Sequence, residues 1–156
     1  MKNSIEDNLF IIKVLKRKLR RNIVRIEYDM EWLSFEKKVT FATQKIRQIP
    51  FSKAKMMISF WEPSDKILSV LKSCNCNDWN ILREYNGKQT SGLIEVYFEH
   101  KINEHPLETI IRKHYGYELG KKDVLSLDLI MAFEKDNKIT ISHLYDDRGF
   151  RIYELM

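Results

Sequence analysis

The densest group of reactive side chains in the sequence lies near its C-terminal end. An imidazole, a phenol, two carboxylates and a guanidinium occur within six residues, namely His143, Tyr145, Asp146, Asp147 and Arg148. Strand alternation predicts that His143 and Tyr145 share a face. Two interpretations stay open: a tightly specified hairpin turn, which Asp146 opens and in which Gly149 has a positive φ, or a recognition or catalytic site. Because no second histidine, lysine or nucleophile lies at a completing spacing, we expect no enzyme here.

Two smaller groups raise the question of a metal. Glu95 and Glu99 sit at even spacing in one expected strand, which makes them either a solvent-facing acidic strip or half of a divalent-ion site that needs further carboxylates. Cys74 and Cys76 form a lone C-x-C, too close for an unstrained disulfide and without the second pair that zinc requires. The chain has no glycine-rich phosphate loop. We therefore predict two reduced thiols, no metal and no cofactor.

The positive charge of the chain is concentrated in one window. The net charge is +5, yet residues 13 to 25 hold seven cations and no acid: Lys13, Lys16, Arg17, Lys18, Arg20, Arg21 and Arg25. The rest of the chain is therefore slightly acidic, and residues 95 to 156 alone have a net charge of −3. This segregation indicates separate surfaces suited to electrostatic docking.

The basic window coincides with an apolar stripe at helical spacing. Steps of three and four residues separate its members, Ile5, Leu9, Ile12, Leu15, Leu19, Ile23 and Ile26. This pattern predicts a long N-terminal helix from about residue 4, with the cations on the opposite face. That face is either simply solvated, or it binds an acidic partner or nucleic acid, or it lies on a membrane surface.

Further elements follow from periodicity and turn residues. Helices are expected over 36–48, from Ser64, and from Pro106 to a glycine at 116 or 120. Strands are expected over 54–61, 79–85, 93–100, 128–134, 138–145 and 150–155, the last three joined by short hairpin turns. The tryptophans Trp32, Trp61 and Trp79 adjoin these elements and are expected in the core. If the last strand, Phe150 to Leu155, forms an exposed sheet edge, oligomerisation through it is conceivable, but Arg151 and Glu154 would blunt such an edge, so a monomer is expected.

These elements predict a single α+β domain over residues 1–156. A helical N-terminal part (1–50), containing the long basic helix, precedes a sheet-containing part (51–156). The sheet is expected to be mainly antiparallel, to end in a three-strand meander, and to carry helices on one face. Apolar runs are too short to span a bilayer and no secretory signal is recognisable, so a cytoplasmic location is expected.

The C-terminal two thirds of the chain resembles a bacterial family known as domain of unknown function 3885. The resemblance covers residues 52 to 155 in element order. It rests on the strand EVYF at Glu95–Phe98 and on the motif YDDRG at Tyr145–Gly149. The family has no assigned enzymatic activity, and some similar proteins are encoded beside secreted polymorphic toxins. The resemblance therefore implies an immunity role, in which a protein binds and masks a toxin.

Two functional hypotheses follow. The first is a non-enzymatic cytosolic protein-binding module, such as an immunity protein, which docks through the acids Glu95, Glu99, Asp146 and Asp147 together with His143, Tyr145 and Arg148. The second is a nucleic-acid-binding module that uses the basic patch Lys13, Lys16, Arg17, Arg20, Arg21 and Arg25.

Overall fold

Seven antiparallel strands form one sheet in the computed structural model, which describes residues 23–61, 64–74, 76–85, 92–98, 105–116, 128–146 and 148–155. The strands are β1 (Ile23–Asp29), β2 (Lys53–Phe60), β3 (Trp79–Arg83), β4 (Gly92–Phe98), β5 (Asp128–Lys135), β6 (Lys138–Asp146) and β7 (Gly149–Leu155). Their spatial order is β1-β7-β6-β5-β2-β4-β3. Three helices accompany them in the described part of the chain: α2 (Phe35–Arg47), α3 (Ser64–Ser73) and α4 (His105–Gly116).

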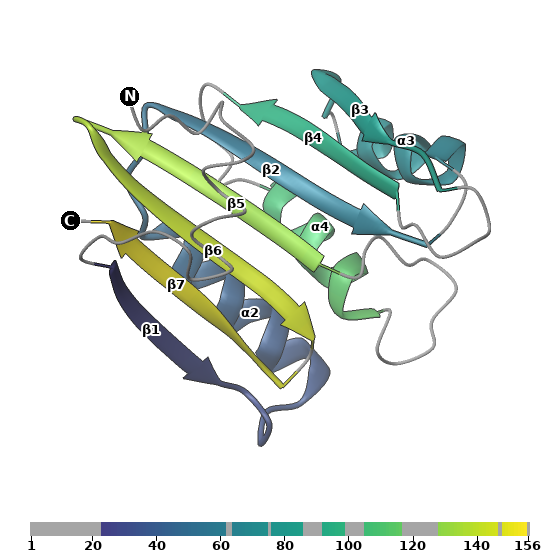
Figure 1. Ribbon diagram of the computed structural model, residues 1–156. Coiled ribbons are helices and arrows are strands. Elements are labelled where there is room, and N and C mark those ends of the chain that lie inside the picture. The colour runs from purple at the N-terminus through teal and green to yellow at the C-terminus, as the bar shows by residue number, and fades with distance from the viewer. Residues whose placement is uncertain are drawn as a thin grey trace.

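The helices pack on one side of the sheet, which we call the helix face (Figure 1). Alternate residues of the central strands, such as Met56 of β2 and Met131 of β5, meet the apolar sides of the helices there. Val39 and Ile46 of α2 are among the residues that complete this core. The interleaved residues point to the opposite side, the second face, where a smaller buried cluster comprises Met57, Ala132, Ile139, Ile141, Tyr153 and Leu155.

The C-terminal meander β5-β6-β7 confirms the expected hairpins. Between β5 and β6, Asp136 and Asn137 have φ values of 50° and 64°, as a two-residue turn of the primed type requires. Between β6 and β7, Asp146 pairs with Gly149, so two residues form the loop. The turn residues thus match the unbroken register of β5 and β6, whereas the register of β6 and β7 shifts between Leu144 and Asp146.

The prediction of a long basic N-terminal helix is wrong where the structure describes that segment. Ile23, Arg25 and Ile26 belong to strand β1, which pairs with β7 along its whole length; residues 1–22 lie outside the described part. The step of three from Ile23 to Ile26 resembles a helical repeat. In the strand, however, the two side chains lie on opposite faces, because Ile23 is opposite Leu155 and Ile26 is opposite Ile152. The part assigned as helical thus contributes a strand, and the sheet dominates the fold.

Three further expectations need correction. The last strand is not an edge, because β7 lies between β1 and β6. Trp32 and Trp61 are not core residues, because 89% and 38% of their surfaces are exposed. The φ of Gly149 lies outside the left-handed region, so the turn does not require glycine for its backbone conformation. A Cβ there would instead overlap the carbonyl oxygen of Tyr28, because β1 lies against β7 at this point.

Candidate functional site

A polar cluster crosses four strands at one end of the second face. His143 and Tyr145 of β6 lie together, with ring centroids 5.6 Å apart. His143 Nε2 is 2.8 Å from Asp128 Oδ1 of β5. On the other side, the guanidinium of Arg151 on β7 lies 4.8 Å from the Tyr145 ring centroid, and its Nε donates to Glu27 Oε1 on β1 at 2.8 Å. The expected pair His143 and Tyr145 is thus the centre of a larger group.

Arg151 is the fixed positive charge of this cluster. Burial alone would lower its pKa, but hydrogen bonds to Tyr153 and Glu27 outweigh burial and raise the pKa above its usual value. Because the guanidinium keeps its proton, it neutralises Glu27 and stacks on the phenol ring at the same time.

The cluster is not arranged for nucleophilic catalysis. The serine nearest to the cluster on this face is Ser59 of β2, which is opposite Asp128. Asp128 therefore lies between Ser59 and His143, whereas a catalytic triad needs the imidazole between the hydroxyl and the carboxylate. In the part of the chain that the structure describes, no three His, Cys, Asp or Glu side chains are placed to hold a metal ion. The geometry of this group fits recognition or structural support.

Glu95 of β4 lies on the same face as His143 but is separated from β6 by β2 and β5. It is buried, and its Oε2 is 3.4 Å from the ammonium of Lys55. Its Oε1 accepts hydrogen bonds from Tyr97 at 2.6 Å and from Asn80 at 3.3 Å. Burial raises the pKa of Glu95, but these donors and the Lys55 charge outweigh burial and hold it below its usual value. Glu95 is therefore an internal anion rather than a docking residue, and Glu99 lies outside the described residues.

The YDDRG turn is attached to the loop after β1. The carbonyl oxygen of Arg148 accepts the backbone N–H of Met30 at 2.8 Å, while the Arg148 side chain is exposed. Asp146 ends β6, and Asp147 lies outside the described residues. Of the expected basic patch, Arg25 is exposed on β1, and Lys13, Lys16, Arg17, Arg20 and Arg21 lie outside the described part.

The residue that sequence reasoning missed is Trp32, in the loop between β1 and α2. Met30, which is fully buried, anchors this loop, and the Leu33 N–H donates to the Met30 carbonyl at 3.0 Å. The Glu31 N–H donates to Asp29 Oδ1 at 2.9 Å, and Ser34 caps α2. These bonds hold the backbone on both sides of an indole that is almost wholly solvent-exposed. An Asp and an N-cap Ser flanking Trp32 were the available signal that it lies in a loop rather than in the core.

A shallow groove of about 340 Å³ lies beside this loop, along the outer side of α2. Its apolar lining residues are Leu33 and Phe41, and its polar lining residues are Glu36, Lys37, Thr40 and Gln44. A groove lined by apolar and polar side chains, next in sequence to an exposed indole, has the composition of a protein-binding surface.

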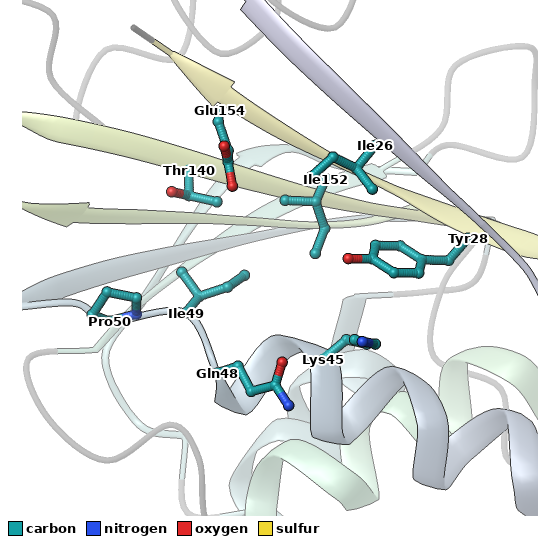
Figure 2. A pocket seen from close by; sticks show the side chains of 9 residues that line it. All are labelled: Ile26, Tyr28, Lys45, Gln48, Ile49, Pro50, Thr140, Ile152 and Glu154. Atoms are coloured by element: carbon teal, nitrogen blue, oxygen red, sulfur yellow. The ribbon is translucent and has the colours of Figure 1, made fainter.

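A second cavity, of about 230 Å³, lies between the C-terminal end of α2 and strands β1, β6 and β7 (Figure 2). Ile26, Ile49 and Ile152 form its apolar wall, and Lys45 and Glu154 bring opposite charges to it. Its volume is below the range of about 300–1,000 Å³ that small-molecule sites occupy. The cavity therefore does not define a ligand.

Cys74 and Cys76 are both free and buried. Burial raises the pKa of both thiols, that of Cys76 to about 12, so neither is a thiolate at neutral pH. The two thiols are thus unreactive members of the core around α3.

Comparisons with family models, with curated proteins and with solved structures find no match to this chain. The resemblance drawn from the YDDRG motif remains a prediction. None of the helices in the described part of the chain combines the length and the apolar character needed to cross a bilayer.

Proposed function

We propose that this protein is a non-enzymatic binding module that acts in the cytoplasm and recognises another protein through the end of the sheet that carries Trp32 and Arg148. The role we propose for it is that of an immunity protein, which masks a toxin. The observation that carries the proposal is the 89% exposure of Trp32 on a hydrogen-bonded loop. Tryptophan and arginine are among the residues most enriched at the energetic centres of protein interfaces.

The loop gives this surface the rigidity that binding favours. Because the Met30 N–H is bonded to the Arg148 carbonyl, the Trp32 loop and the YDDRG turn form one connected surface. A loop backbone that is held in place before binding loses little conformational entropy on association. This arrangement supports a recognition role for the motif, with the turn itself as its scaffold.

The docking surface differs from the acidic one that the sequence indicates. Glu95 does not belong to the proposed docking surface, because its carboxylate is buried against Lys55. The exposed charges of the Trp32 end are instead mixed, with Asp29 and Glu31 beside Arg148. A partner would therefore present an apolar pocket for the indole, with polar groups around it.

The test uses proteins encoded beside the gene of this chain as candidate partners. Isothermal titration should show binding, and Trp32→Ala should weaken it by about 2–4 kcal/mol, the loss typical of a central interface tryptophan. Trp61→Ala is the matched control, since Trp61 follows β2, four strands from β1, and packs on Tyr85. In cells that express the toxin, the wild type and Trp61→Ala should restore growth, and Trp32→Ala should not.

If Trp32→Ala bound the partner protein as tightly as the wild type, the proposal that Trp32 lies at the centre of the binding surface would be refuted. Titration of labelled RNA and duplex DNA at about 50 mM and 200 mM salt tests the alternative, since nucleic-acid affinity falls steeply with salt. Salt-sensitive binding to either nucleic acid, with no binding to a neighbouring protein, would replace the proposed function by the nucleic-acid one.

A further inference from the structure

The two edges of the described sheet differ in how well they are protected against pairing. β3 is five residues long and its register with β4 shifts between Ile81 and Arg83. Short, bulged edges are a common protection against association. β1, in contrast, keeps an unbroken register with β7 over seven residues, from Ile23 to Asp29. Among the described strands β7 is its partner, so its other side is the long, regular edge of the sheet as far as the structure describes it.

The side chains of β1 favour pairing at this edge. Val24 is exposed at 44%, one of three large apolar side chains so exposed among the described residues. Arg25 and Glu27 follow on the second face, with side chains 35% and 51% exposed. Glu27 already binds Arg25 and Arg151, but both contacts use Oε1. A carboxylate accepts up to four hydrogen bonds, so Glu27 has capacity for another cation.

We propose that β1 pairs with β1 of a second copy, antiparallel and centred on Ile26, so that the two sheets continue into one. In such a two-fold pairing, a residue that lies a given number of positions before Ile26 is opposite the residue that lies the same number of positions after Ile26 in the other copy. Arg25 of each copy then faces Glu27 of the other, and the exposed Val24 faces Tyr28. Opposite charges and apolar–aromatic pairs directly across an antiparallel pair are stabilising.

The sequence of β1 selects this register among its neighbours. A register centred on Arg25 would place the guanidinium groups of the two copies opposite each other. A register centred on Glu27 would place two carboxylates opposite each other. Like charges directly opposite destabilise a strand pair. The inference does not depend on the proposed function, because it rests on the backbone edge and the charges of β1 and makes no use of the Trp32 indole.

Sedimentation equilibrium of the full chain tests the assembly. The wild type should form a species of twice the 18.8 kDa chain mass. Arg25→Glu brings carboxylates together in both pairs and should raise the dimer dissociation constant at least tenfold. Lys135→Glu, at the exposed start of the β5–β6 turn, makes the same charge change away from the edge and should leave dimerisation unchanged. Circular dichroism checks that both variants fold.

Cross-linking tests the register. Opposed Cα atoms in an antiparallel pair are about 4.5–5.5 Å apart, within disulfide range, so Ile26→Cys should give an oxidised dimer. Val24→Cys should not, because the two copies of that residue lie four positions apart. The native thiols are buried and should not contribute. A monomer at all concentrations up to about 200 µM overturns the proposal. Unchanged dimerisation of Arg25→Glu, or cross-linking of Val24→Cys in place of Ile26→Cys, overturns the charge-selected register.

Discussion

Removing one partner of the buried Lys55–Glu95 pair should destabilise the protein strongly. The side chains are 0% and 5% exposed, and Nζ and Oε2 are 3.4 Å apart. At an effective dielectric constant of about 20, this distance corresponds to a gross attraction of about 5 kcal/mol. Desolvation of both groups offsets much of it. A single replacement, however, leaves the other charge buried and uncompensated, which costs about 3–5 kcal/mol.

The assay is urea unfolding at pH 7 of the wild type, Lys55→Met, Glu95→Gln and the double variant. Each single variant should lose about 3–5 kcal/mol of unfolding free energy. The double variant should lose about 2 kcal/mol less than the sum, because it leaves no charge unpaired. The matched control is the ion pair between Lys53 of β2 and Glu134 of β5, whose Nζ and Oε2 atoms are 3.1 Å apart but whose side chains are 45% and 16% exposed. Its coupling should stay below about 1 kcal/mol.

The same pair predicts a pH dependence. The folded pKa of Glu95 lies below its ordinary value of 4.5, so its stabilising effect is complete above that value and is lost as the pH falls through the folded pKa. Glu95→Gln should remove this part of the acid destabilisation. If the two single replacements prove additive at pH 7, or if Glu95→Gln leaves the acid limb unchanged, the pair is solvated and the reasoning is refuted.

Three further outcomes are expected. Gly149→Ala should lower the unfolding free energy by about 1–3 kcal/mol in urea, since its Cβ would overlap the Tyr28 carbonyl oxygen; an unchanged midpoint would contradict the close approach of β1. Asn137→Val should cost about 1–3 kcal/mol because a β-branched residue tolerates φ of 64° poorly, whereas Asn137→Gly should be nearly neutral. Iodoacetamide at pH 8 should modify Cys74 and Cys76 slowly in the native protein and rapidly in urea; fast native alkylation would show that the thiols are accessible.

The polar cluster shows how far sequence reasoning extends toward a site. Strand alternation alone places His143 and Tyr145 on one face. Asp128, Arg151 and Glu27 join them only through the registers β5–β6, β6–β7 and β1–β7, which connect residues far apart in sequence. Pairing across four strands brings these groups together, and no local spacing contains that information.

From Ser34 onward, local signals in the sequence are sufficient to predict the helices, strands and turns. Ser34 caps α2, Asp136 and Asn137 make the β5–β6 turn, and the apolar periodicities of the later helices and strands match the elements observed. These signals act between residues a few positions apart, so they can be recognised in the sequence without knowledge of the tertiary structure.

Three features depend on long-range contacts: the strand conformation of Ile23 to Asp29, the exposure of Trp32 and the burial of Glu95. The β1 segment follows an amphipathic pattern in the sequence, but seven residues of pairing with β7, more than 100 positions away, make it a strand. The apolar indole of Trp32 is exposed to solvent. The carboxylate of Glu95 is buried, because Lys55 of the neighbouring strand supplies the compensating cation. Burial and charge pairing depend on which elements become neighbours, and long-range strand order sets that.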